Sequence, residues 1–178
     1  SWLKLISAHR FAIAKQGVID RIERQAQKVR PREVEKGTAT RLFRESITAV
    51  DQASAYDSLR KAERDYTEKM AAVPTIPGFA PLIVGVTGEF YVVLEPFSNL
   101  DVEIELGKLG AEVHRNTFIS EWTKFSFFNP FEKDYQAEIH KAAQPYLSRD
   151  VGGDGWETVG EKVYHAHDWD GMVHLAPF

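Results

Sequence analysis

The sequence contains no cysteine, and this absence excludes several kinds of chemistry. A chain without thiols forms no disulfide, has no cysteine nucleophile and offers no thiolate to zinc or to an iron–sulfur cluster. Such a composition is typical of intracellular proteins, and we expect a cytoplasmic location.

Long apolar runs and a strong positive charge are also missing. No segment approaches the roughly 20 apolar residues that span a bilayer, and no basic-then-apolar leader opens the chain. The formal net charge of −4 argues against a broad nucleic-acid surface. We therefore expect neither a membrane nor a nucleic acid among the partners.

The remaining composition is that of a globular protein, with 178 residues of which 43% are hydrophobic and 27% charged. This length suits one domain with a helical appendage. Ser1-Trp2 opens inside a helical pattern, and residues 176–178 stop where a strand would deliver its next loop. We expect the chain to be a fragment that is cut short at its C-terminal end.

The first part of the chain predicts three helices, because apolar residues recur three, four or seven positions apart. The three stripes are Phe11, Val18, Ile22, Ala26 and Val29; Leu42, Phe43, Ile47, Val50 and Ala53; and Leu59, Ala62, Tyr66, Met70 and Val73. Ser54 with Asp57 resembles a capping pair for the third helix. The proline- and glycine-rich residues 74–78 form a linker, which separates a helical extension, 1–73, from an α/β domain, 74–178.

The second part predicts strands that alternate with helices. We expect strands at 82–86, 111–115 and 172–176, and helices at 99–109, 119–128, 130–147 and around Val159 and Val163. This alternation favours a parallel sheet with right-handed crossovers. The predicted fold class is α/β, a flavodoxin-like or Rossmann-like half-domain with parallel strands and a helical N-terminal extension.

The turn after the first of these strands is the first candidate site. Gly88 lets the backbone approach a ligand, while Glu89 and Tyr91 offer an acceptor and a hydroxyl. The alternative is structural, with Glu89 accepting backbone N–H groups of a neighbouring loop. Open α/β sheets bind ligands at the carboxyl edge, where this turn is expected to lie.

Further candidates are expected at the same edge, each with a structural alternative. Ser98 and Asn99 suit an anion at a helix start but also suit helix capping. Ser120 and Glu121 follow the second strand, next to Trp122, which is either a packing anchor or a stacking platform. The remaining candidate ligand-binding residues are Gly152 and Gly153, which suit a flexible connection equally well, and Phe178 at the end of the third strand.

Histidines near the C-terminus are not expected to bind a metal. His165 and His167 are two residues apart, whereas metal-binding pairs on helices prefer a spacing of four. His174 is expected to be a buried, hydrogen-bonded histidine in the last strand. The sequence therefore predicts no metal ligands and leaves the catalytic residues unknown.

Several segments taken in order resemble the 2-hydroxyacyl-CoA dehydratase and benzoyl-CoA reductase superfamily, in its branch of CoA-substrate-specific enzyme activases. These segments are RPREVEKG at 30–37, GVTGEFY at 85–91, PFSN at 96–99, LGAEV at 109–113, SEW at 120–122 and DGMVHLAPF at 170–178. The chain departs from the pattern at residues 153–155, where Gly-Asp-Gly replaces the Gly-His-Gly of many relatives.

This resemblance implies ATP-driven, low-potential electron delivery to acyl-CoA substrates. It also implies a [4Fe-4S] cluster in a longer parent chain, with no cofactor held by this fragment. The expected partners are a missing downstream domain, an ATPase activase domain or subunit, and acyl-CoA. The fragment would form one wall of a cluster or acyl-CoA crevice and would not be catalytic alone.

Two other functions remain open. One is a small-molecule or nucleotide-binding module that works without a cluster, although the chain has no Gly-x-Gly-x-x-Gly run and no phosphate-loop lysine. The other is an interaction scaffold, for which the aromatic residues at 125–131 would form the interface if exposed; the alternative is that these rings fill the gap between the helices and the sheet.

Overall fold

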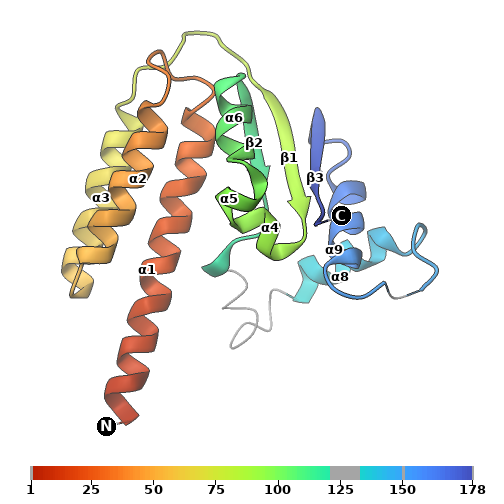
Figure 1. Ribbon diagram of the computed structural model, residues 1–178, viewed down its shortest axis with the longest axis horizontal. Helices are drawn as coiled ribbons and strands as arrows, with labels where there is room; N and C mark the ends of the chain where they lie inside the picture. The colour runs from red at the N-terminus through yellow and green to blue at the C-terminus, as the bar shows by residue number, and fades with distance from the viewer. Residues whose placement is uncertain (1, 121–132, 150, 178) are drawn as a thin grey trace. The chain divides into compact units, whose positions relative to one another are not determined.

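The computed structural model describes residues 2–120, 133–149 and 151–177 (Figure 1). The chain divides into two compact units. One contains residues 1–81 and 107–112, and the other contains 82–106 and 113–178. The predicted Trp122, Glu121 and Phe178 and the aromatic segment 125–131 lie outside the described residues.

The first unit is built on three helices, α1 (Trp2–Val29), α2 (Thr38–Gln52) and α3 (Tyr56–Ala71), which pack side by side (Figure 1). Their predicted apolar stripes meet in one core. That core includes Val18, Ile22, Ala26, Leu42, Val50, Leu59 and Met70. The predicted stripes are confirmed except at Ile47, which is 39% exposed and lies at the edge of the α2 stripe.

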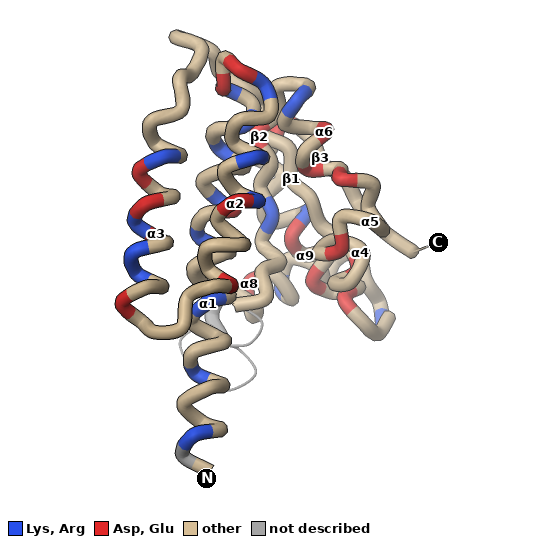
Figure 2. The backbone as a smooth tube through the Cα atoms, turned by 60° about the vertical axis from the view of Figure 1, so that its left-hand side comes forward, with Lys and Arg blue, Asp and Glu red and all other residues tan. Residues whose placement is uncertain are grey.

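The outer faces of these helices carry charges of both signs, as their alternating basic and acidic residues predict. Figure 2 shows Lys and Arg interspersed with Asp and Glu along α3. The predicted capping pair of α3 is wrong in register, since the N–H of Ala55 donates to Oγ of Ser58 at 3.2 Å. The helix begins later than expected because an extended Ala55 precedes it.

A buried glutamate organises the segment 30–37 that connects α1 to α2. The carboxylate of Glu33, which is fully buried, accepts the N–H groups of Gly37 at 2.6 Å and Ala39 at 2.7 Å. These amides belong to the start of α2, where unpaired N–H groups favour an anion. Arg30 Nε donates to Thr40 Oγ1 at 3.0 Å, so the segment is held by side chains within this unit.

The second unit contains the sheet residues that position the candidate site. The strands are β1 (Leu82–Gly88) and β3 (Gly171–Leu175), which belong to this unit, and β2 (Ala111–Arg115), of which residues 113–115 belong to it. Their order in the sheet is β2-β1-β3. β1 and β3 run parallel, with Gly88 opposite Leu175. The mixed α/β class with a small parallel sheet is thereby confirmed.

The single helix predicted at 99–109 is wrong. The structure has α4 (Phe90–Leu94), α5 (Pro96–Asn99) and α6 (Val102–Lys108). Glu95 caps α5, and left-handed backbone at Leu100 and Asp101 separates it from α6. The predicted left-handed stop at Gly110 is confirmed, with φ of +92°.

Helix α9 (Gly155–Tyr164) packs against β1, and α8 (Lys133–Ala143) packs closely against α9 (Figure 1). A β-carbon at Gly160 would lie 2.1 Å from the Ile139 carbonyl oxygen, so glycine permits this close approach. α8 ends before the predicted residue 147, two residues ahead of Pro145. Among the helices within the described ranges, none is both long and apolar enough to cross a membrane.

Candidate ligand-binding site

The turn after β1 is closed tightly against the end of β3. Gly88 has φ of +151°, and a β-carbon there would lie 2.0 Å from the carbonyl oxygen of Leu175. The next N–H, from Glu89, donates to that same oxygen at 2.9 Å. A residue with a side chain at position 88 would separate the two strands, so glycine is required here.

Two carboxylates fix the chain that leaves this turn. Glu89 caps α4 by accepting the N–H of Val92 at 2.9 Å. Asp154, at the start of α9, accepts the N–H of Phe90 at 2.9 Å. Asp154 therefore ties the turn to α9. Glu89 has a structural role, but the N–H that it accepts belongs to its own helix α4 and not to a neighbouring loop.

An open cavity of about 220 Å³ lies beside this turn. Its walls come from the ends of β1 and β3, the start of α9 and the segment before α9. The lining residues are Glu89, Leu147, Val151, Asp154, Gly155, Thr158, Val159, His174, Leu175 and Ala176. The cavity is thus largely apolar, with two carboxylates, a hydroxyl and an imidazole among its walls.

His174 is linked to a lysine outside the cavity wall. Lys162 Nζ lies 2.8 Å from His174 Nδ1. Slight burial lowers the pKa of His174, and the Lys162 charge lowers it further; slight burial also lowers the pKa of Lys162. Lys162 therefore donates to a neutral imidazole. The predicted hydrogen bond of His174 is confirmed, but its predicted burial is wrong because the side chain is exposed on the edge strand β3.

α9 carries a buried glutamate, Glu161, on the side that faces the sheet. Oγ1 of Thr87 donates to Oε2 of Glu161 at 2.9 Å. Burial raises the pKa of Glu161 most strongly, and the carboxylates of Glu157 and Asp154 add to the rise, while hydrogen bonds from Thr87 and Asn116 oppose it. Figure 2 shows acidic residues on α9 and beside α4 in this region.

The predicted site residues are only partly brought together. Glu89 lines the cavity, and Gly88 shapes the turn beside it. Tyr91 lies on α4 and is 62% exposed, and Ser98 is exposed on α5. Asn99 makes hydrogen bonds to residues close to it in the sequence.

The contacts of Asn99 are local. Its Nδ2 donates to the carbonyls of Val92 and Val93 at 3.0 Å, and its Oδ1 accepts the N–H of Val102 at 3.4 Å. It thus joins three short helices, a structural role that includes capping. Val92, Val93 and Val102 do not line the cavity.

The other predicted residues lie farther along the chain. Ser120 is buried, and Gly152 and Gly153 both have left-handed backbone, with φ of +69° and +53°. The Gly152 carbonyl accepts the N–H of Gly155 at 3.3 Å, which turns the chain into α9. Glu121 and Phe178 lie outside the described residues.

Sequence reasoning missed Asp154 and Thr158 as cavity residues. The sequence pattern places Asp154 in a glycine-rich loop and Thr158 inside an expected helix. An acid directly before a helix is a capping signal that could have marked Asp154. Thr158 follows one helical turn later, which places it on the same face.

The comparisons with known proteins add no relative. No protein-family model matches the chain, and no curated protein or solved structure shows significant similarity to it.

Proposed function

We propose that this chain forms one wall of an acyl-CoA crevice in a protein of the 2-hydroxyacyl-CoA dehydratase type. The observation that carries the proposal is the position of the cavity, at the carboxyl ends of β1 and β3. In the order β2-β1-β3, the two later strands lie on opposite sides of β1, so the direction of the strand order changes at β1. Open α/β sheets bind their ligands at such a switch point.

The same strand order supports the finer fold proposal, a flavodoxin-like or Rossmann-like half-domain with a helical N-terminal extension. Flavodoxin-like sheets begin with the order 2-1-3, and ligands bind between the first and third strands. Two segments that carry the family resemblance, 85–91 and 170–178, include the end of β1 and the whole of β3, which are paired here.

The chemistry of the cavity favours the acyl part of the ligand. Leu147, Val159 and Leu175 provide apolar walls, and the volume of about 220 Å³ suits a short acyl chain. Glu89 and Asp154 would repel the phosphates of coenzyme A. The nucleotide part would therefore lie away from this cavity.

The cluster and the remaining partners belong to other parts of the parent protein. The chain has no cysteine, so its residues do not fit a [4Fe-4S] cluster, which is held by thiolates. A downstream domain would supply those ligands, and an ATPase activase domain or subunit would supply electrons. The chain would carry no catalysis alone, and the proposed protein would be cytoplasmic.

The second candidate function is a small-molecule-binding module that needs no cluster. The observation that favours it is that every lining residue of the cavity belongs to the second unit. Saturable binding of a small apolar molecule that lacks a thioester would support this alternative over the first.

Calorimetric titration tests the proposal with three probes: butyryl-CoA, free CoA and butyryl-pantetheine, which lacks the nucleotide. The expected result is saturable binding of both butyryl thioesters and much weaker binding of free CoA. Ala176→Phe places a large ring at the cavity wall from an exposed position and should abolish the binding.

The matched control is Ala137→Phe, since Ala137 is exposed on α8 and does not line the cavity. Its binding should equal that of the unmodified chain. Equal affinity for free CoA and butyryl-CoA, absence of thioester binding, or full binding by Ala176→Phe would each contradict the proposal.

A further inference from the structure

A tyrosine, a histidine and an aspartate form a continuous hydrogen-bonded chain in the second unit, apart from the cavity lining. The hydroxyl of Tyr135, near the start of α8, lies 3.2 Å from Nε2 of His165. Nδ1 of His165 lies 3.3 Å from Oδ2 of Asp168. The order is that of a nucleophile, a base and a group that orients the base.

The hydrogen-bond partners assign the tautomer of His165. The Asp168 carboxylate only accepts, so in the neutral imidazole Nδ1 of His165 carries the proton and Nε2 is an acceptor. Nδ2 of Asn116 lies 3.0 Å from the Tyr135 hydroxyl oxygen and 3.1 Å from His165 Nε2. The amide therefore donates toward the oxygen on which negative charge would develop if Tyr135 lost its proton.

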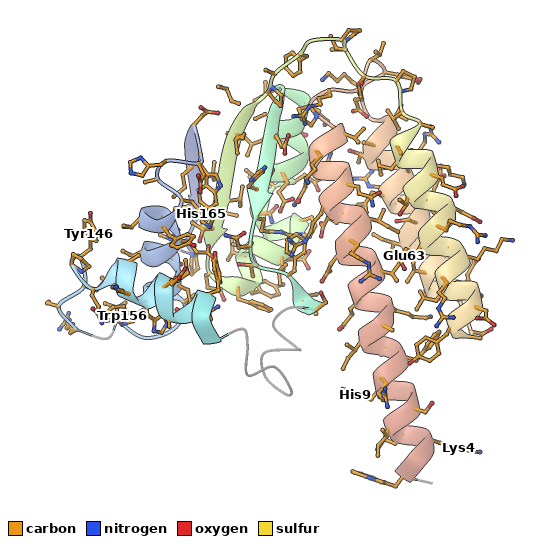
Figure 3. The ribbon with its side chains drawn as sticks, turned by 180° about the vertical axis from the view of Figure 1, so that it is seen from behind. Lys4, His9, Glu63, Tyr146, Trp156 and His165 are labelled. Carbon is orange, nitrogen blue, oxygen red and sulfur yellow. The ribbon has the colours of Figure 1, made fainter. Side chains whose placement is uncertain are left out.

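Aromatic rings hold this arrangement in place. The imidazole of His165 stacks on Trp169, with centroids 4.5 Å apart and an interplanar angle of 16°. Tyr164 makes T-shaped contacts with both His165 and Tyr135, with ring centroids 4.9 Å and 5.8 Å apart. The His165 side chain is 17% exposed, so it is sheltered but still reaches the surface (Figure 3).

The charged and titratable groups around the histidine come from several elements. Asp168 follows α9, Tyr164 ends it and is hydrogen-bonded to Glu138 of α8, and Glu161 lies one helical turn before His165, hydrogen-bonded to Asn116. Asp168 is 70% exposed, so its pull on the imidazole is screened by water. We therefore expect Asp168 to contribute less than His165.

We propose that Tyr135, His165 and Asp168 form an acyl-accepting site whose substrates are activated esters or thioesters, with Tyr135 as the nucleophile. This inference does not rest on the proposed crevice function. In the step, Tyr135 Oη bonds to the acyl carbon while its proton passes to His165 Nε2. The bond from the acyl carbon to the leaving group then breaks, and the proton on His165 passes to that group.

The test uses p-nitrophenyl acetate, with peptide mass spectrometry to measure acetylation at each tyrosine over time. Tyr146 is an internal control, because it is 66% exposed and lies away from His165 (Figure 3). Exposure alone predicts that Tyr146 reacts faster than the half-buried Tyr135. The proposal predicts the reverse, with acetylation at Tyr135 that neutral hydroxylamine removes.

The base is tested by substitution. A general base contributes about 100-fold or more, so His165→Gln should slow acetylation of Tyr135 by about 100-fold and leave Tyr146 unchanged. Asp168→Asn should slow it less, and His167→Gln, on the neighbouring exposed histidine, should not slow it.

Two results would overturn the inference. One is acetylation of Tyr146 as fast as that of Tyr135 in the unmodified chain. The other is an unchanged Tyr135 rate in His165→Gln, when circular dichroism shows that this variant is folded. Because the probe carries no coenzyme A, a negative result here leaves the crevice proposal to its own test.

Discussion

Gly88→Ala should destabilise the end of the β1–β3 pair, because the alanine meets two separate obstacles. The backbone at position 88 has φ of +151°, a region that costs about 1–3 kcal/mol for a residue with a side chain. The new β-carbon would also lie 2.0 Å from the Leu175 carbonyl oxygen. The strands must separate there, which weakens the bond from the Glu89 N–H to that oxygen.

The expected loss is about 3 kcal/mol, the sum of the backbone cost and about 1 kcal/mol for the weakened hydrogen bond. Native-state hydrogen exchange of the β1 and β3 amides measures it locally. A loss of this size lowers their protection by about 100-fold. The amides of α1 to α3 should be unaffected, since they belong to the other unit.

Two glycines serve as matched controls for the two obstacles. Gly153 has φ of +53° with no atom near its missing β-carbon, so Gly153→Ala should cost only about 1 kcal/mol. Gly171, in β3, has neither obstacle, and Gly171→Ala should change the free energy of opening of these amides by less than about 0.5 kcal/mol. If Gly88→Ala behaves like Gly171→Ala, the reasoning about this turn is wrong.

Three further predictions concern buried and paired charges. Burial raises the folded-state pKa of Glu161 above the ordinary 4.5, so the free energy of unfolding should fall as pH rises above 4.5 and the carboxyl ionises. The total loss is about 1.4 kcal/mol for each unit by which the folded-state pKa is raised. Glu161→Gln, which can still accept the Thr87 hydroxyl, should flatten this pH dependence in urea unfolding; an unchanged slope would contradict it. Glu33→Ala should lower the free energy of unfolding by about 2–3 kcal/mol, because two amides at the start of α2 lose their acceptor; a loss below about 0.5 kcal/mol would show that they find other partners. Lys162→Met should raise the pKa of His174 in an NMR titration, and an unmoved pKa would show that the lysine charge is not felt there.

The helices and strands that follow from hydrophobic periodicity could be predicted from the sequence. The stripes of α1, α2 and α3 are long, so their pattern identifies the buried face despite single exceptions such as Ile47. The strands were short, but the glycines at positions 85 and 88 and the buried Val113 marked two of them. The same alternation predicted the parallel sheet that the structure has.

Much of the site could not be predicted, because it depends on contacts between distant residues. Glu89 and Asp154 are far apart in sequence, and only the fold brings them to one cavity. The spacing of His165 and His167 bears only on metal binding and carries no signal for a contact with the hydroxyl of Tyr135. The breaks between α4, α5 and α6 arise from left-handed backbone at Leu100, which the sequence does not reveal because leucine rarely adopts it.

The most direct test of the central claim maps the bound ligand onto the chain. In a titration with butyryl-pantetheine followed by amide NMR shifts, the account predicts saturable changes at Glu89, Thr158 and Leu175, around the carboxyl ends of β1 and β3. Saturable changes confined to residues away from these strand ends, or no saturable change at all, would contradict the account.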